Sequence, residues 1–424
     1  MRLHWFSPLP PDRSEIAHFA TTIVEALANE AEVTVWTDGH RGDVHVPRGA
    51  VLRAYPPRGT GTDVFAKSDC AFFNLGNHAK FHAWIWNAAQ TVPGIAIVHD
   101  PALQDLFIAA SGSAARYTAL MRQTYGHAGE TAAGRVLRGE ASPLDLSRAY
   151  PLTDIAFQHA LAGVVHWPGA LRAPRVPVRC LPLPYAARAH PPRARPIGES
   201  TPARLMMMGH LGPNRRLAQT LDALAAFPRR DKVRLDIYGM AGGLDIGALA
   251  AERGIAPQVA HHGYVPAERL DAALREADLL INLRSPTMGE VSATQLRAWD
   301  HALPTLVSYT GWYATIPPEA AGFVRTNPPE IERADIQRHL AALLDDPASY
   351  IAMGRAGRQF LVERHAVGPY VAGLLELARA VPRLAPEWAQ GYLADRVGAL
   401  TVGWPENEVI SNTAAERIFD LFEP

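Results

Sequence analysis

The sequence is most informative at residues 282–292, which read Asn282-Leu283-Arg284-Ser285-Pro286-Thr287-Met288-Gly289-Glu290-Val291-Ser292. The run before it, Asp278-Leu279-Leu280-Ile281, is typical of a buried parallel strand, and residues 292–301 have the pattern of a helix. Glu290 is therefore expected in a Pro/Gly turn between a strand's carboxyl end and a helix's amino end, where open α/β sheets bind ligands. Backbone N–H groups at such a turn can hold phosphate while a carboxylate accepts hydrogen bonds from hydroxyls. The turn thus favours a ligand that carries both sugar hydroxyls and a diphosphate.

Short apolar runs alternate with amphipathic helices along almost the whole chain, which predicts an α/β fold with doubly wound parallel sheets. Residues 102–162 are expected to be mostly helical, with breaks near Gly126 and Ser142. The strands expected in the first half are Leu3–Phe6, Glu32–Thr37, Cys70–Leu75, Ile95–His99 and Gly163–His166. Those expected in the second half are Arg204–Met208, Val233–Tyr238, Ala260–Tyr264, Leu279–Leu283 and Thr305–Ser308. Helices are expected there near 215–227, 245–253, 266–276, 292–302, 330–345 and 347–363.

The apolar pattern breaks between Ala186 and Pro202, where proline and charge mark a linker. We expect two Rossmann-like domains that face each other across a central cleft. The N-terminal domain spans 1–190, the linker 191–202, and the C-terminal domain 203–365. A helical tail at 366–424 follows, for which packing back on the N-terminal domain is one option.

Composition limits the classes of function. A chain of 424 residues with 48% hydrophobic content exceeds one ordinary core, and a net charge of −1 argues against recruitment of nucleic acid by a global field. Two cysteines and no secretory leader favour the reducing cytoplasm, and no apolar run approaches the roughly 20 residues that span a bilayer. Peripheral contact with the inner face of the cell membrane remains open. One basic face on the expected helices could make this contact, although a simply solvated face is the stronger interpretation. This face comprises Arg116, Arg122, Arg135 and Arg138.

A second candidate site follows the strand at 204–208, where the chain reads Gly209-His210-Leu211-Gly212-Pro213-Asn214-Arg215-Arg216. A glycine turn lets the backbone approach an anion, and two guanidiniums at a helix start add positive charge. An ordinary turn with solvated arginines is the alternative. Because Gly209 and Glu290 both follow strands of one sheet, we expect them at the same edge.

In the first half, His99-Asp100 directly follows a strand and could orient an acceptor hydroxyl or move a proton, although a structural histidine is equally compatible. Asn77 and His82 mark another polar strand end, where simple packing is the stronger interpretation. Ser14 can cap the first helix.

Several chemistries are disfavoured by missing motifs. The sequence has no Asp-x-Asp pair for a metal that bridges a diphosphate, and no Gly-x-Ser-x-Gly, His-Glu-x-x-His, Cys-x-x-Cys or Walker-type loop. Metal-free group transfer from an activated donor remains.

Four ordered motifs lie in the chain up to about residue 365. They are Ser7-Pro8-Leu9-Pro10-Pro11 through Ala17, Leu75-Gly76-Asn77 with His82, Pro93-Gly94 through His99-Asp100, and Leu283 through Ser292 followed by Pro304. Together they resemble the retaining glycosyltransferases of family 4, which have the two-domain GT-B fold, and the resemblance implies that 1–190 is the acceptor-side domain and 203–365 the donor-binding domain. The resemblance implies a nucleotide-sugar donor, no cofactor or metal, and a saccharide or lipid-linked acceptor in bacterial polysaccharide or glycoconjugate assembly.

The resemblance also implies residue roles. Arg215 stands where the family usually has a lysine on the donor diphosphate, and His99 would lie near the transferred sugar and the acceptor. The expected catalytic residues are His99, Asp100, Arg215 and Glu290. The expected donor-binding residues are Gly209, His210, Arg215, Arg216, Thr287, Met288, Gly289, Glu290, Val291 and Ser292. The expected acceptor-side residues are Ser14, Glu15, Asn77 and His82.

Some positions depart from the family pattern. Glu15 replaces a loop glycine, and Ala298 stands eight residues after Glu290, where the family's second carboxylate is expected. Anchored on Pro304 instead, the two carboxylate positions hold Gly289 and Arg297. A non-catalytic nucleotide-sugar-binding GT-B subunit and a nucleotide-sugar 2-epimerase therefore stay open as alternatives, as do the nucleotide, the sugar, the acceptor and the oligomeric state.

Overall fold

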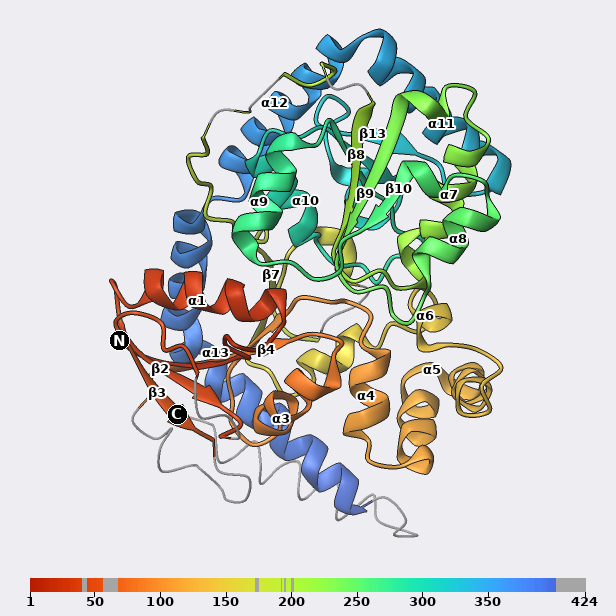
Figure 1. The fold of residues 1–424 in the computed structure, drawn as a ribbon. Coiled ribbons are helices and arrows are strands. Elements are labelled where there is room, and N and C mark those ends of the chain that lie inside the picture. Colours follow the sequence, from red (N-terminus) through yellow and green to blue (C-terminus); the bar gives the residue numbers. More distant parts are fainter. Residues whose placement is uncertain are drawn as a thin grey trace. The chain divides into compact units, whose positions relative to one another are not determined.

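The computed structural model describes residues 1–39, 44–55, 68–171, 175–191, 193, 196–199 and 202–401. The chain forms two compact units, one made of Met1–Pro182 with the C-terminal residues from Val367, the other of Leu183–Ala366. Figure 1 shows the elements of both units.

The first unit is built on a seven-stranded sheet in which all neighbouring strands are parallel, in the order β3-β2-β1-β4-β5-β6-β7. The strands are β1 (Arg2–Phe6), β2 (Glu32–Thr37), β3 (Ala50–Ala54), β4 (Cys70–Leu75), β5 (Ile95–Val98), β6 (Ala162–Val165) and β7 (Val178–Cys180). The helices are α1 (Glu15–Leu27), α3 (Ala79–Ala89), α4 (Gln104–Ala110), α5 (Ala114–Leu137), α6 (Pro143–Leu146) and α13 (Val367–Thr401). The predicted breaks near Gly126 and Ser142 are a kink within α5 and the cap of α6.

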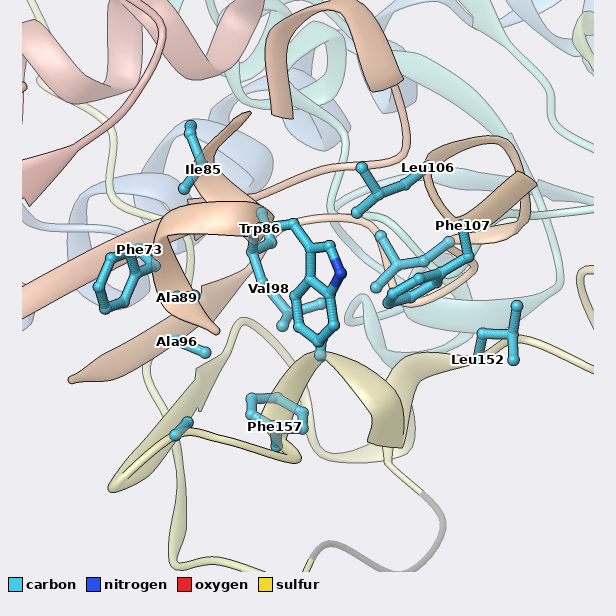
Figure 2. Close-up of a cluster of buried hydrophobic side chains, with 14 of the residues drawn as sticks. Phe73, Ile85, Trp86, Ala89, Ala96, Val98, Leu106, Phe107, Leu152 and Phe157 are labelled. Carbon is cyan, nitrogen blue, oxygen red and sulfur yellow. The ribbon is translucent and has the colours of Figure 1, made fainter. Parts of the chain in front are cut away.

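Side chains of these strands alternate between two apolar layers because successive strand residues point to opposite faces. Phe73 belongs to the layer under α3 and α4, and Phe72 to the layer under α1 and α13. Figure 2 shows the first layer, in which Trp86 of α3 meets Phe107 of α4 edge to face with ring centroids 5.1 Å apart. Both faces of β4 are thus buried, as is usual for a central parallel strand, and Asn74 is its one polar residue.

The other face of the first sheet is covered by α1 and α13. Ser14 caps α1 as predicted, since its Oγ accepts the Ile16 N–H at 3.2 Å. Tyr370 and Leu374 of α13 are buried in the same apolar layer as Leu3 and Trp5. The C-terminal helix therefore completes the core of the first unit.

The second unit has a six-stranded parallel sheet in the order β10-β9-β8-β11-β12-β13. Its strands are β8 (Ala203–Met208), β9 (Val233–Tyr238), β10 (Val259–His261), β11 (Leu279–Asn282), β12 (Thr305–Ser308) and β13 (Gly322–Val324). Its helices are α7 (Leu217–Ala225), α8 (Ile246–Glu252), α9 (Ala267–Glu276), α10 (Ala293–Asp300), α11 (Pro329–Asp345) and α12 (Pro347–Arg364). One face carries α7, α8 and α11, and the other carries α9 and α10. The predicted α/β class with two doubly wound parallel sheets is confirmed.

The second unit begins at Leu183, and the described residues of the expected linker, 191, 193, 196–199 and 202, fall within it. The chain is fixed to that unit by hydrogen bonds from Arg188 N–H to Asp300 Oδ1 at 3.0 Å and from Gly198 N–H to Asp278 Oδ1 at 3.1 Å. The segment is held by polar contacts of its backbone and not by an apolar face. Its sequence therefore shows no apolar periodicity.

Some details differ from the sequence-based expectations. The helix expected at 215–227 begins only at Leu217, because Arg216 has φ +57° and interrupts it after a short turn at Pro213–Arg215. The edge strands β3, β7 and β13 were not expected, since they are short and β3 and β7 are largely exposed, which gives them no clear apolar run.

Candidate active site

The candidate donor site lies at the carboxyl ends of β8 and β11, which are neighbours in the second sheet. Strand order reverses between them, because β8 continues to β9 on one side while β11 continues to β12 on the other. Such a switch point is where doubly wound sheets bind ligands. The structure brings the Gly209 turn and the 282–292 loop to this one edge.

The turns after β8 and β9 each begin with a glycine that adopts a positive φ angle, Gly209 at +107° and Gly239 at +120°. The Gly209 N–H donates to the Tyr238 carbonyl at 2.9 Å. A Cβ on Gly239 would lie 2.0 Å from the Gly209 carbonyl oxygen, and a Cβ on Gly209 would lie 2.6 Å from Arg215 Nη2. Both turns therefore pack backbone against backbone or guanidinium, with no room for a side chain.

Arg215 is 7% exposed, and its guanidinium links three segments of the site. Its Nε donates to the His210 carbonyl at 3.1 Å and its Nη1 to Asn282 Oδ1 at 3.1 Å. Asn282 in turn donates to Ser292 Oγ at 3.3 Å and Gln295 Oε1 at 3.0 Å. A positive charge is thus fixed where β8, β11 and α10 meet.

Glu290 is 8% exposed and is paired with Arg284, a residue that sequence reasoning did not select. Arg284 Nη1 donates to Glu290 Oε1, and the Met288 N–H donates to Oε2 at 3.0 Å. Arg284 is anchored by its own N–H to Ser308 Oγ at 2.8 Å. The sequence offered one indication of this pair, which is that a basic residue stands six positions before the acid in the same loop.

The remaining residues of the loop shape it. The Gly289 N–H donates to Thr287 Oγ1 at 3.0 Å, and Ser292 Oγ caps α10 by accepting the Gln295 N–H at 3.2 Å. Val291 is buried at 7% exposure. His210 is exposed on the turn after β8.

Arg216 and Arg297 are directed to protein carboxylates. Arg216 forms a two-pronged ion pair with the buried Glu332 of α11, with its Nε 2.9 Å from Oε1. Arg297 of α10 binds Asp271 of α9, with its Nη2 2.7 Å from Oδ1. The guanidinium expected beside Arg215 at the donor site, that of Arg216, thus fastens α7 to α11. The guanidiniums held within the two loops are those of Arg215 and Arg284.

In the first unit, side chains from three strand ends form a buried chain of contacts. His99 Nε2 lies 3.0 Å from Asn74 Oδ1, and His99 Nδ1 lies 3.1 Å from His166 Nε2. His166 Nδ1 lies 3.0 Å from the Leu181 carbonyl oxygen. Phe19 of α1 packs edge to face on His99 with ring centroids 4.7 Å apart. His99 is thus held rigidly after β5.

These contacts need more protons than two neutral imidazoles carry. Asn74 Nδ2 donates to the Phe6 carbonyl at 3.0 Å, so Asn74 Oδ1 and the Leu181 carbonyl are acceptors at the two ends. Three contacts between two acceptors require three protons, whereas two neutral rings supply two. Burial, with His166 nearby, lowers the pKa of His99 well below its usual range. When both rings are neutral, one of the three contacts has no proton.

The other residues expected on the acceptor side have structural contacts. Asn77 caps α4 from outside, since its Oδ1 accepts the Asp105 N–H at 2.9 Å and its Nδ2 donates to Asp105 Oδ2 at 2.6 Å. The Asn77 N–H donates to Asp100 Oδ2 at 2.9 Å. His82 is 1% exposed and donates through Nδ1 to the Asn74 carbonyl at 3.0 Å, and burial lowers its pKa to about 4. Glu15 is exposed in the first turn of α1.

The basic face on α5 makes local ion pairs. Arg122 lies 3.7 Å from Glu130, and Arg138 bonds Glu140 at 2.6 Å. Within the described ranges, no helix is long and apolar enough to cross a membrane. Among the same residues, no group of three His, Cys, Asp or Glu side chains is arranged to hold a metal ion.

Neither a protein-family model nor a curated protein sequence matches the chain. Solved structures do match. Sucrose-phosphate synthase from Thermosynechococcus elongatus has a TM-score of 0.62 at 16% identity, covering 90% of this chain and 99% of that protein. HepE from Anabaena, solved with UDP-glucose, has a TM-score of 0.58 at 10% identity over 90% of this chain and 100% of its own. WaaG, a glycosyltransferase involved in lipopolysaccharide biosynthesis, has a TM-score of 0.52 at 14% identity over 89% and 98%. At these identities the likeness concerns the fold, and the chain therefore has the GT-B fold of these enzymes.

Proposed function

We propose that this chain is a retaining glycosyltransferase that moves a sugar from a nucleotide-sugar donor to a saccharide or lipid-linked acceptor without a metal ion. The observation that carries the proposal is that Gly209, Arg215 and the loop that carries Glu290 lie at the switch point of the second sheet, where Arg215 bonds Asn282 at the start of that loop. A side-chain-free turn, a fixed cation and a carboxylate are the groups that a sugar diphosphate needs. The fold likeness to HepE, solved with UDP-glucose, supports the same ligand class.

In this proposal Arg215 stabilises the negative charge that develops on the departing diphosphate. Its guanidinium is already fixed by His210 and Asn282, so little reorganisation accompanies the reaction. Glu290 accepts hydrogen bonds from hydroxyls of the donor sugar, with its carboxylate oriented by Arg284.

Exposed apolar side chains on the same sheet edge would accommodate the nucleobase. Met240 and Leu244 follow β9 at 54% and 48% exposure, and Tyr264 follows β10 at 65%. Large apolar groups at the surface in loops beside an anion site suit the flat face of a base.

For the chemical step we propose front-face displacement. The acceptor oxygen forms the new bond to the anomeric carbon on the face from which the diphosphate leaves, and the acceptor proton passes to a diphosphate oxygen. Glu290 is not assigned as a nucleophile because it is ion-paired with Arg284. His99 and Asp100 remain the proposed acceptor-side residues.

The proposal is tested by binding and then by turnover. A thermal-shift panel of UDP-, GDP-, ADP- and dTDP-sugars should identify a donor that stabilises the protein. With that donor, Arg215→Ala should lower turnover by about 100- to 1,000-fold, as for a lost oxyanion donor. Arg333→Ala, which removes an exposed guanidinium from α11, is the control and should leave turnover unchanged. Stabilisation by none of the sugars, or full turnover in Arg215→Ala, would reject the proposal.

A second candidate is a non-catalytic nucleotide-sugar-binding subunit. It is favoured by Arg297, whose guanidinium is bound to a protein carboxylate. This residue stands at one of the two positions considered for the family's second carboxylate and is bound to Asp271. Calorimetry that detects donor binding, combined with no glycosyl transfer and no donor hydrolysis, would select this candidate.

A further inference from the structure

Thr294 of α10 presents a hydroxyl to the space beside the Gly209 turn. A Cβ placed on Gly209 would lie 3.6 Å from Thr294 Oγ1 and 2.6 Å from Arg215 Nη2. The hydroxyl and the guanidinium thus flank one small space, which exists because residue 209 has no side chain. Neither sequence pattern nor family resemblance selected Thr294.

The neighbouring polar side chains of α10 are occupied by protein partners. Ser292 Oγ accepts the Gln295 N–H at 3.2 Å, and Gln295 Nε2 donates to Thr305 Oγ1 at 2.6 Å. Thr294 is half-buried, and within the described part of the chain its hydroxyl makes no hydrogen bond. A threonine inside a helix commonly bonds the carbonyl one turn before it, but Thr294 is the second residue of α10 and has no such helical turn before it. Its hydroxyl proton is therefore available to a ligand.

The chemistry of this space favours an anionic oxygen. A hydroxyl can donate to either a sugar hydroxyl or a phosphate, but the buried Arg215 guanidinium beside it rewards a negative charge. Hydrogen bonds to charged groups are also stronger than those between neutral groups. Phosphate is the group of a nucleotide sugar that satisfies both neighbours at once.

We infer that Thr294 is a diphosphate-binding residue of the donor site, whose hydroxyl donates a hydrogen bond to a phosphate oxygen of the nucleoside diphosphate next to Arg215. This inference rests on the proposed function and adds to it a contact made by the side chain, not the backbone, of α10. It requires that diphosphate affinity depends on the hydroxyl of Thr294 and not on the shape of its side chain.

The test is calorimetric titration of the full-length protein with UDP, GDP, ADP and dTDP, followed by the tightest-binding diphosphate and its parent nucleoside on variants. Thr294→Val keeps the branched shape without the hydroxyl, and Thr294→Ser keeps the hydroxyl. We expect Thr294→Val to weaken diphosphate binding about 10- to 100-fold, Thr294→Ser to stay within about 3-fold of wild type, and nucleoside binding to change in neither. Thr22→Val, which removes a hydroxyl from α1 in the first unit, should leave binding unchanged.

The failures are separable. Wild-type protein that binds none of the four diphosphates would overturn the proposed function and this inference together. Wild-type binding with equal affinity in Thr294→Val would overturn only the inference, as would equal losses in Thr294→Val and Thr294→Ser, or an equal loss for the nucleoside. Thr294→Ala serves as a second hydroxyl-free variant if Thr294→Val lowers the melting temperature, and it should show the same loss of diphosphate affinity.

Discussion

The carboxylate of Glu290 is held by the Arg284 guanidinium and by the Met288 N–H at 3.0 Å. The side chains of Arg284 and Glu290 are 15% and 11% exposed. Because both charges are largely removed from water, each is stabilised by the opposite charge of the other. This pairing fixes the orientation of the acid that is proposed to bind the donor sugar.

Arg284→Met should therefore destabilise the protein, because it leaves a buried carboxylate without its cation. Breaking a buried pair costs about 3 kcal/mol, measurable as a lower urea midpoint at pH 7. The double variant Arg284→Met/Glu290→Gln should recover much of this loss, and Arg284→Lys should lie between. A urea midpoint of Arg284→Met equal to that of wild type would contradict this assignment.

The His99–His166 pair offers a second test on single side chains. Asn74→Asp places a carboxylate 3.0 Å from His99 Nε2, where wild type has an amide oxygen. The new charge should raise the pKa of His99, because an opposite charge favours the imidazolium and completes the three-proton chain. Nitrogen-15 NMR of labelled histidines would follow the titration, with His99→Gln used to assign the signal. An unchanged titration of His99 in Asn74→Asp would show that the chain of contacts does not control its protonation.

Among the elements, the β8 and β9 turns depend on each other. Gly239 N–H donates to the Gly263 carbonyl at 2.7 Å, while its Cα faces the Gly209 carbonyl so closely that a Cβ would lie 2.0 Å away. The turn that carries the proposed diphosphate contact is thus shaped by the next strand along the sheet.

Gly239→Ala should combine backbone strain with this clash and cost roughly 3 kcal/mol or more, with loss of donor binding. Gly243→Ala is the matched control, since Gly243 has φ +88° but open space around its Cα. Gly243→Ala should lower the free energy of unfolding by about 1 kcal/mol, which is the cost of the backbone strain alone. Urea denaturation of both variants separates the two contributions, and equal losses would mean that the close approach of the two turns is unimportant.

For the molecule as a whole, the first unit is completed by the end of the chain. Tyr370, Leu374 and Ala378 of α13 are buried among residues of β1, β2 and β4. The second unit, in contrast, is one continuous segment with its own apolar layers.

Truncation after Ala366 should therefore unfold the first unit while the second remains folded, because the loss exposes one face of the first sheet. Limited proteolysis with mass spectrometry should yield a resistant fragment near residues 183–366. A truncated protein with the proteolytic pattern and melting temperature of wild type would disprove this dependence.

Buried neutral histidines make both units sensitive to acid. Burial lowers the pKa of His4 and His82 in the first unit, and of His301 and His365 in the second, to about 4 in each case. Unfolded histidines have a pKa near 6.5, so between pH 6.5 and 4 the unfolded chain binds protons that the folded chain does not. The stability that these neutral histidines contribute is therefore present above pH 6.5, and it is lost as the pH falls through this window.

His82 and His365, the two most deeply buried of the four, should each contribute a loss of about 2 kcal/mol between pH 7.5 and 5. Urea unfolding at pH 7.5 and pH 5 measures the sum. His82→Asn retains a donor near the Asn74 carbonyl without titrating, and its stability should fall by about 2 kcal/mol less over the same interval. A variant with the full wild-type acid dependence would show that His82 is protonated in the folded protein.

The sequence alone determined what depends on neighbours within a few positions. Apolar runs located the strands of both sheets except the edge strands β3, β7 and β13. Ser14 predicted the cap of α1, and the Pro/Gly turn around Glu290 predicted the strand end that lies at the switch point. These features follow from periodicity and turn chemistry, which are local.

Tertiary structure decided which side chains meet. Arg216 was expected on the ligand but binds Glu332, 116 residues away, while Arg284 was passed over and holds Glu290. Thr294 reaches the Gly209 turn, and α13 returns to the first sheet. Such pairings depend on strand order and on which helix face packs inward, and no pattern of nearby residues encodes a partner a hundred positions away.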